Sequence, residues 1–420
     1  MVLLAIALVG VIAGALIFRA APRLAFAAWT GVLFFVPIWV GFSLGYFYSA
    51  ITLVTLLCVM AASAHGFRFT KVDWILIAFG LLVTGSFAFG GVALGHLLIA
   101  VLDWLLPYLF GRVVLARVGI HFISACIAVA AVCAAALAIV EFVTGTNLFV
   151  LMRWDNIGYT LWSTLQPRGG FVRAEGAFGH SIALGASLSI ASVFVLATRW
   201  KLGIRIACLA VLGVAVVLTF SRIGLVSLAL GIVLSIAFLA GLLTTRARLT
   251  VAAISILGAL VAVPFLNEVF SAAGTEASGS ADYRLDLVSL VSLMAPLGRS
   301  PGYQVLPNGE VFVGSFQSID SVLILLGLRF GYIPLILLLC LLVTAVVAMF
   351  RSRANPPLIA VIAQIPTFAT VDLITQLPYL VWFCGGLAVS LYILDDERAG
   401  TPAMKKTWAL VPEGGLDRHG

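Results

Sequence analysis

The feature that most constrains this chain is a series of apolar stretches, each about as long as a membrane is thick. Residues 206–245, for example, contain one charged residue, Arg222. A hydrocarbon core of about 30 Å needs about 20 apolar residues per helix. This rule predicts about thirteen spans: 2–18, 24–42, 46–63, 74–90, 95–111, 118–143, 181–198, 203–220, 223–245, 249–266, 320–350, 355–372 and 379–394. We therefore expect an all-α polytopic integral membrane protein with about 12–13 transmembrane helices, residues 1–420 forming one transmembrane domain.

The composition excludes a soluble globular protein. The chain is 63% hydrophobic and 10% charged, whereas soluble domains are about 25% charged. No basic residue precedes the first span, and Arg19 and Arg23 follow it. This arrangement predicts a membrane anchor with its N-terminus outside, not a cleaved signal peptide.

Basic residues recur in every second predicted loop. They are Arg19/Arg23, Arg68/Lys71, Arg112/Arg117, Arg199/Lys201/Arg205, Arg246/Arg248 and Arg351/Arg353. The positive-inside rule makes these loops cytoplasmic, together with the tail 395–420. The two long loops, 144–180 and 267–319, are then extracytoplasmic. The net charge of +7 is thus an orientation signal, and we expect no nucleic-acid partner.

Nucleotide and metal chemistry lack their usual motifs. The sequence has no Gly-rich loop ending in Lys-Ser/Thr, its five histidines are scattered, and its six cysteines all fall in apolar stretches. We therefore expect no cofactor and no metal site, and cysteines that serve in packing.

Polar residues nevertheless gather in the predicted outer loops. Arg168, Arg173, Glu175 and His180 lead into one span, and Arg222 occupies a tight turn between two spans. A solvated loop and an arginine that reaches the membrane interface are the simpler interpretations of these two features.

The second long loop adds another set of polar residues. Residues 280–303 predict an amphipathic helix that begins near Arg284, followed by a Gly/Pro turn with Arg299 and Tyr303. Asp320 precedes the next apolar run, where a helix N-cap is the simpler interpretation. Taken together, several arginines and one or two carboxylates on one side of the membrane suit a phosphate-bearing ligand and a proton acceptor.

Three local patterns carry a resemblance to a known family. RAEGAFGHSIALG (173–185) is similar to an Arg-x-x-Gly-x-Phe stretch that runs into a span. TFSRIGLVSL (219–228) is similar to a Ser-Arg-x-Gly turn, and YRLDLVSLVSLMAPLGRSPGY (283–303) to an Arg-led helix followed by Pro-Leu-x-Gly. Residues 165–335 thus resemble the bacterial O-antigen ligase and polysaccharide polymerase superfamily.

A fourth pattern matches in part. Ligases of this family carry His-Asn/Ser, nine residues, and then Gly-x-x-Gly or a similar ending. This chain has Asp320-Ser321 and then Gly331-Tyr-Ile-Pro334, with Arg329 where an acidic residue is often found. The aspartate in place of histidine favours a polymerase over a ligase.

The resemblance implies a GT-C-like helical bundle in the bacterial inner membrane, with residues 267–319 as an extracytoplasmic lid over a lipid-accessible cavity. It implies an undecaprenyl-diphosphate-linked oligosaccharide as substrate, and a flippase and a chain-length regulator as pathway partners. We expect a metal-independent, inverting transfer to a sugar hydroxyl on the periplasmic side.

The expected roles follow from charge. Arg222 and Arg284 would stabilise the departing diphosphate, and Asp320 would accept the proton, with Glu175 as the alternative. Substrate-binding residues would be Arg168, Arg173, Glu175, His180, Arg299 and Tyr303.

Three alternatives remain open at this point. One is a ligase that transfers glycan to a lipid core or another acceptor. A second is a transporter of lipid or polysaccharide intermediates, for which Asp103, Glu141 and Asp372 are candidate intramembrane carboxylates. The third is a structural protein of the envelope.

Overall fold

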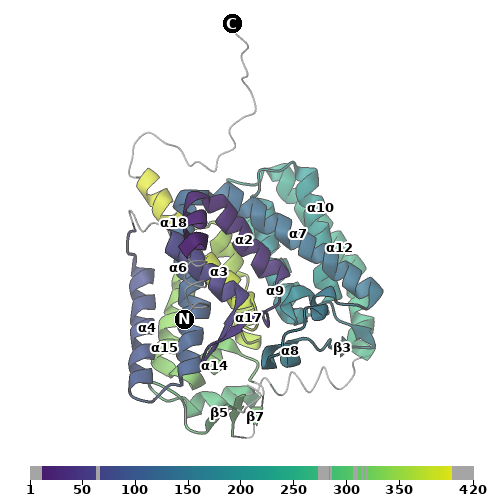
Figure 1. The fold of residues 1–420 in the computed structure, drawn as a ribbon. Helices are drawn as coiled ribbons and strands as arrows, with labels where there is room; N and C mark the ends of the chain where they lie inside the picture. The colour runs from purple at the N-terminus through teal and green to yellow at the C-terminus, as the bar shows by residue number, and fades with distance from the viewer. Residues whose placement is uncertain are drawn as a thin grey trace.

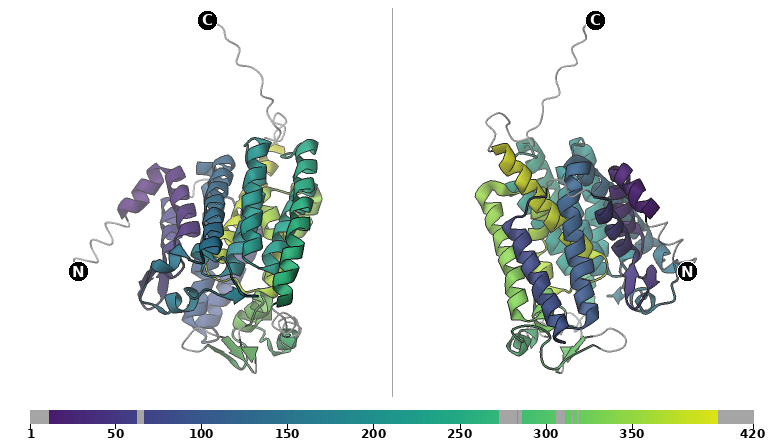
Figure 2. Two further views of the ribbon diagram at one scale, coloured as in Figure 1. Left: turned by 90° about the vertical axis from the view of Figure 1, so that its right-hand side faces the viewer. Right: turned by 60° about the vertical axis from the view of Figure 1, so that its left-hand side comes forward.

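The computed structural model describes residues 12–62, 67–272, 283, 286–305, 311–314, 316–317 and 319–399. Within these residues the chain forms a bundle whose long helices run in much the same direction, with short strands gathered at one end (Figure 1, Figure 2). The α-helices after Ile12–Ala20 are α2 (Pro22–Phe35), α3 (Ala50–Ala61), α4 (Lys71–Ala88), α5 (Leu94–Leu98), α6 (Leu106–Val118), α7 (Ile120–Thr144), α8 (Ile157–Trp162), α9 (Ser181–Ala197), α10 (Leu202–Leu218), α11 (Arg222–Phe238), α12 (Thr245–Ala272), α14 (Val322–Phe330), α15 (Tyr332–Ala348), α16 (Pro356–Ile362), α17 (Ile365–Thr370) and α18 (Leu377–Ala399).

Shorter elements join these helices. Two π-helical segments, η1 (Ile99–Leu105) and η5 (Met349–Arg353), continue neighbouring α-helices, and η2 (Leu148–Leu151), η3 (Gly176–Phe178) and η4 (Leu287–Leu293) are 3₁₀ helices. The strands are β1 (Gly41–Ser43), β2 (Phe47–Ser49), β3 (Pro167–Arg168), β4 (Phe171–Val172), β5 (Tyr303–Val305), β6 (Val311–Val313) and β7 (Phe316–Gln317). They pair antiparallel as β1–β2, β3–β4 and β5–β6–β7.

The described residues confirm the predicted all-α polytopic class. Six helices are long and apolar enough to cross a membrane, or seven if the bent pair Ile12–Ala20 and Pro22–Phe35 is one span. Shorter apolar helices occupy several other predicted spans, among them α3, α9, α10 and α11. The count of 12–13 spans stays a prediction.

One predicted span is interrupted. The run 320–350 divides into α14 and α15 at Gly331, whose φ is +97°. A β-carbon there would lie 2.7 Å from the carbonyl oxygen of Pro296 and from the Cα of Leu297. Only glycine permits both this backbone conformation and this approach, so the segment around Pro296 crosses the chain at this break.

The centre of the bundle is α9, which packs against α7, α10, α11, α16 and α18 and is buried along its whole length. Small residues allow the closest of these contacts. A β-carbon on Gly224 of α11 would lie 3.2 Å from the Cα of Gly185 of α9. The Ser189 hydroxyl lies 2.7 Å from the Gly185 carbonyl and 2.8 Å from the Gly224 carbonyl. Such small-residue contacts are typical of helix pairs in membranes.

The predicted loops gather at opposite ends of the bundle. At one end Arg117 donates to the Arg19 carbonyl and Arg112 to the Arg68 carbonyl. We call this end, which carries the basic loops, the basic end. At the opposite end, which we call the loop end, the strands and α8 lie together (Figure 1). There the Arg299 N–H donates to the Gly91 carbonyl.

A buried ion pair stabilises the basic end. Asp73 accepts from Arg112 Nε at 2.9 Å and Nη2 at 3.1 Å, from the Tyr108 hydroxyl at 2.7 Å, and from the N–H and hydroxyl of Thr70 at 2.7 Å each. Arg112 also donates to the Ser390 hydroxyl at 2.9 Å, which ties α6 to α18. Both charges are therefore paired and hydrogen-bonded away from water.

Removing one partner of this pair should be costly. Asp73→Asn leaves the Arg112 charge buried without its carboxylate, and we expect a loss of about 3–5 kcal/mol in unfolding free energy. Unfolding of the purified protein in detergent measures the change. The control is Arg68→Gln, which removes an exposed ion pair with Glu397 and should cost less than about 1 kcal/mol. Equal effects of the two substitutions would contradict this role for Asp73.

Candidate functional site

The loop before α9 folds over the end of α10. Arg168 Nη1 donates to the Phe220 carbonyl at 3.0 Å, and Arg173 Nε donates to the Thr219 carbonyl at 2.9 Å. The Ala174 N–H donates to the Leu218 carbonyl at 3.2 Å. The carbonyls at a helix C-terminus carry partial negative charge, so the two guanidinium groups are stabilised there. Two of the predicted arginines thus position the turn between α10 and α11.

That turn is buried and strained. Phe220 has a φ of +46°, which is costly for a residue with a large side chain. Its ring is fully buried and packs against Phe142, Phe171 and Phe265, with ring centroids 5.8–6.0 Å apart. The aromatic packing and the Arg168 hydrogen bond hold this conformation.

Arg222 begins α11 directly after the turn. Ser221 caps the helix, its hydroxyl accepting from the Gly224 N–H at 3.1 Å. The Arg222 side chain is exposed, and its guanidinium lies 4.4 Å from the Phe270 ring centroid. A cation in the first turn of a helix is disfavoured by the helix dipole, whereas an anion is favoured there. An anionic ligand bound here would therefore interact favourably with both the N-terminus of α11 and the charge of Arg222.

Two buried carboxyl groups lie beside this turn. Glu141, near the end of α7, accepts from the N–H groups of Glu175 at 3.1 Å and Gly176 at 2.8 Å, and from Asn147 Nδ2 at 3.0 Å. Glu175 accepts from the Gln166 N–H at 3.2 Å. Burial, helped by the neighbouring Glu141, raises the pKa of Glu175 to about 8, although the Gln166 hydrogen bond and the Arg173 charge act in the opposite direction. At neutral pH Glu175 is therefore mostly protonated and offsets little of the arginine charge.

His180 indicates the sign of the local field. It is the N-cap of α9, and its Nδ1 accepts from the Ile182 N–H at 3.2 Å. Burial lowers the pKa of His180 to about 3, and the charges of Arg173 and Arg168 contribute in the same direction. The histidine thus stays neutral in a positively charged environment. We call Arg168, Arg173 and Arg222 the arginine cluster.

A second polar group lies at the loop end around α14. The Tyr303 hydroxyl, on β5, lies 3.3 Å from His96 Nε2 and accepts from Arg329 Nε at 3.2 Å. Arg329 is buried, and its charge interacts with that of Asp372. Arg329, His96, Tyr303 and Asp372 form what we call the Arg329 cluster.

Asp320 lies at the edge of this second cluster. The Val322 N–H donates to the Val371 carbonyl at 3.1 Å, so the segments that carry Asp320 and Asp372 run side by side. Asp372 is half-buried, and the charges of Arg329 and Asp320 both act on it. Asp320 is exposed, and its charge adds to the effect of burial in raising the pKa of Tyr283. Two carboxylates, one exposed and one half-buried, therefore lie together near Arg329.

The segment 371–376 joins the two clusters. Asp372 stands at its start, and Gln376 at its end donates to the carbonyls of Ala177 and Val36, both at 3.0 Å. Ala177 belongs to η3, next to Glu175. Both clusters are thus built on the same end of the bundle and share one connecting segment.

The predicted site residues divide between the two clusters. Arg168, Arg173 and Arg222 meet at the α10–α11 turn, with Glu175 and His180 beside them. Tyr303 and Asp320 belong with Arg329, and Arg299 is an exposed residue whose charge reaches His96. Arg284 lies outside the described residues, so its pairing with Arg222 stays a prediction. The predicted amphipathic helix falls partly outside them too, and its described part is the 3₁₀ helix η4.

Nothing in the sequence indicated the contacts that four residues make: Glu141, Arg329, Asp372 and Asp103. It indicated only that the three carboxylates lie in apolar stretches. Asp103, in η1, accepts from the Tyr379 hydroxyl, which also bonds the Thr52 hydroxyl at 2.6 Å. This chain of side chains runs from η1 through α18 to α3.

No family model, curated protein or solved structure matches this chain. Among the described residues, no three His, Cys, Asp or Glu side chains come together in a way that would hold a metal ion. The function is therefore argued from the two clusters themselves.

The raised pKa of Glu175 has a consequence for stability. The folded protein keeps a proton that the unfolded chain, with a pKa of 4.5, releases. Stability from this group is fully present below pH 4.5 and is lost as the pH rises through about 8. In Glu175→Gln this loss should vanish, so the wild type should lose stability relative to the variant across that window. Thermal unfolding in detergent at several pH values measures the difference.

The comparison with a variant isolates Glu175 from other groups. His180 acts in the opposite direction, because its lowered pKa costs stability as the pH falls below 6.5. The matched control is Glu268→Gln, which changes an exposed glutamate of α12. If wild type and Glu175→Gln show parallel pH profiles, Glu175 does not hold its proton in the folded state.

Proposed function

We propose that this protein is a bacterial cell-surface polysaccharide polymerase of the O-antigen or exopolysaccharide type. It would transfer an undecaprenyl-diphosphate-linked glycan to a sugar hydroxyl on the extracytoplasmic side of the inner membrane. The sequence resemblance supplies the substrate class. The structural support comes from the loop end of the bundle, where positive charge and carboxylates gather.

The observation that carries the proposal is the position of Arg222. An exposed guanidinium at the positive end of α11 is unfavourable in the free protein and favourable once an anion is bound. Arg168 and Arg173 add positive potential from the other side of the turn. A diphosphate that leaves with growing negative charge would be stabilised there by about 3 kcal/mol or more per well-placed donor.

The Arg329 cluster and Asp320 would activate the acceptor, the sugar hydroxyl that attacks the donor. Asp320 is exposed and lies beside Asp372. An exposed carboxylate within reach of an attacking hydroxyl can accept its proton. Direct attack on the anomeric carbon, with departure of the diphosphate, would invert the configuration at that carbon. Asp320 remains our first choice for the base, with Asp372 as a neighbour that tunes or replaces it.

The segment between α12 and α14 would act as the lid. Its described part contains η4 and the β5–β6–β7 sheet, which pack against α14 around a small apolar core. The residues of that core are Leu287, Leu290, Tyr303, Val313, Ile319, Leu325 and Leu328. If the bent pair and the shorter apolar helices also cross the membrane, the bundle reaches the expected 12–13 spans. This part of the proposal includes the GT-C-like architecture.

One observation favours a transporter as the second candidate. Asp103 lies within the apolar stretch 94–118 and accepts from Tyr379, and intramembrane carboxylates often mark ion pathways. Purified protein that consumes a lipid-linked oligosaccharide without an ion gradient would support the enzyme. Movement of the intact lipid only under a gradient would support the transporter.

Arg222 should be indispensable for chain growth. Arg222→Ala removes the charge, and Arg222→Lys keeps the charge but loses the planar two-pronged donor. We expect both to lower polymer formation by about 100-fold or more, as loss of a transition-state donor does elsewhere. The measurement is a ladder gel after incubation with undecaprenyl-diphosphate-linked repeats.

Two controls accompany this test. Arg246→Ala removes an exposed arginine at the basic end, and Phe270→Leu removes the ring under Arg222 while keeping its charge. Both should retain polymer formation, and all variants should reach the membrane in normal amounts. Unimpaired chain growth in Arg222→Ala would remove this residue from the mechanism.

The two aspartates can be separated by kinetics. Asp320→Asn should lower kcat by about 10²–10⁴-fold and leave the KM for the lipid-linked donor nearly unchanged, because it removes a proton acceptor and no donor contact. Asp372→Asn should have a smaller effect on kcat. The opposite order, with Asp320→Asn near normal, would assign the base to Asp372.

A further inference from the structure

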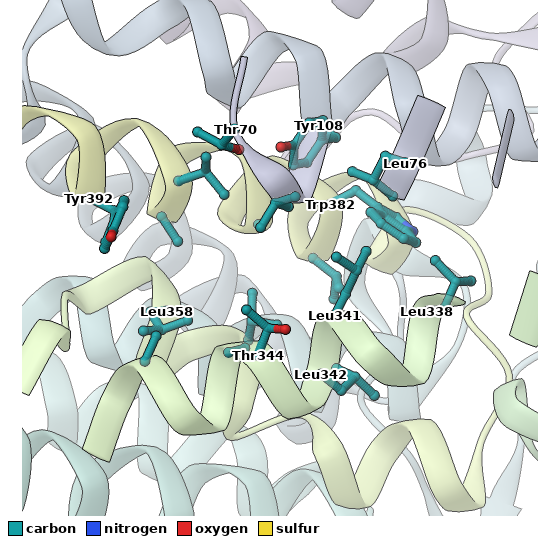
Figure 3. A pocket seen from close by; sticks show the side chains of 18 of the residues that line it. Thr70, Leu76, Tyr108, Leu338, Leu341, Leu342, Thr344, Leu358, Trp382 and Tyr392 are labelled. Carbon is teal, nitrogen blue, oxygen red and sulfur yellow. The ribbon is translucent and has the colours of Figure 1, made fainter. Parts of the chain in front are cut away.

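A large apolar cavity lies away from the arginine cluster. Its volume is about 670 Å³, and residues of α4, α15 and α18 are among those that line it. Figure 3 shows Leu338 and Leu341 facing the same space as Leu76 and Trp382. The ring of Trp382 stacks on Trp104 with centroids 5.9 Å apart. Most of the lining is aliphatic or aromatic, so the cavity favours a hydrocarbon chain over a polar ligand.

Among the described residues, the charged ones that line this cavity are all cations and all stand at the basic end. Lys71 begins α4, and Arg351 and Arg353 lie in η5 at the end of α15. All three are exposed. Arg353 also lies over the Tyr392 ring, 4.7 Å from its centroid. The opposite end, near Val322 and Leu373, is apolar.

The carboxylates around this end do not line the cavity. Asp73 is bound to Arg112, and Glu397 pairs with Arg68. Asp395 and Asp396 border a neighbouring cavity of about 500 Å³, which also touches Arg353. Lys71 and Arg351 have no such acidic neighbour in the lining of either cavity. A positively charged opening therefore leads into an apolar interior.

The cavity is long enough for a lipid chain. Its lining on α15 runs from Leu338 to Arg351, which corresponds to ~20 Å at the rise of an α-helix. One leaflet contributes about half of the ~30 Å hydrocarbon core. A fatty acyl chain that enters at the basic end can thus lie in the cavity for its full length.

We propose that this cavity binds an acyl chain of an anionic phospholipid from the leaflet at the basic end, with the lipid phosphate held by Lys71, Arg351 and Arg353. This site is separate from the proposed donor site. The diphosphate of the donor belongs at the loop end with Arg222, whereas the cations of the cavity stand at the opposite end of the bundle. The bound chain fills the space between α15 and α18 and also contacts α14, which ends at the break at Gly331 where α15 begins.

The test uses purified full-length protein and two lipids with identical acyl chains. Phosphatidylglycerol is anionic and phosphatidylcholine has no net charge. After equilibration with an equal mixture and removal of loosely held lipid, mass spectrometry quantifies what the protein retains. We expect the wild type to prefer phosphatidylglycerol by roughly fivefold or more, since each basic residue close to net anionic lipid contributes about that factor, whereas the choline group cancels the phosphate charge of phosphatidylcholine.

Two sets of variants separate the headgroup from the chain. The triple variant Lys71→Gln, Arg351→Gln, Arg353→Gln should lose the preference for phosphatidylglycerol. Leu341→Trp, which fills the cavity, should reduce retention of both lipids. The matched control is Lys201→Gln with Arg246→Gln, two exposed cations at the same end but outside the cavity. This control should keep the wild-type preference.

Three results would overturn the proposal. Equal retention of the two lipids by the wild type is the first, and an unchanged preference in the triple variant is the second. The third is that undecaprenyl phosphate displaces phosphatidylglycerol equally well from the wild type and from the triple variant. This result would assign the cavity to an isoprenoid chain. Because the charge variants change only exposed side chains, their result stands even if Leu341→Trp fails to fold. None of these outcomes depends on polymer formation, so the proposed function stands or falls separately.

Discussion

A hydrocarbon bilayer offers no water to polar groups, so each charge or peptide group inside this bundle must find its partner in the protein. The described residues meet this condition in different ways at the two ends. At the basic end, Asp73 and Arg112 satisfy each other. At the loop end, Glu141 accepts from two backbone N–H groups of the loop before α9. That carboxylate therefore fixes the segment from which Arg168 and Arg173 reach the α10–α11 turn.

This division separates the arginines that stabilise the turn from the one that we propose binds the ligand. Arg168 and Arg173 are committed to backbone carbonyls of the turn, while Arg222 is exposed at the helix end where its charge is least stable. The aromatic packing of Phe220 holds the turn in its strained form, so the position of Arg222 is fixed before any ligand arrives. Pre-organisation of this kind is what electrostatic stabilisation of a leaving group requires.

Hydropathy and charge predicted much of the helical framework, because helix length and loop charge follow directly from the membrane. The break at Gly331 was missed, since the crossing of Pro296 that requires it is a tertiary contact. The alternation of loop charge put Arg168, Arg173 and Arg222 on one side of the membrane, but it did not predict that the first two bind carbonyls of the turn before Arg222. The pairing of Asp320 with Asp372 was beyond prediction, because 51 residues separate them and the Val322–Val371 hydrogen bond joins them only in the folded chain.

The enclosure of α9 has a consequence for biogenesis. This helix is rich in serine, alanine and glycine, and protein covers it on every side. Two of the five α-helices that it packs against, α16 and α18, are synthesised long after it. When synthesis has reached only α9, these hydroxyl groups must therefore be kept out of lipid in another way. They can lie in the insertion machinery or pack against the earlier helix α7. Completion of the C-terminal helices is thus the step that seals the middle of the protein from lipid.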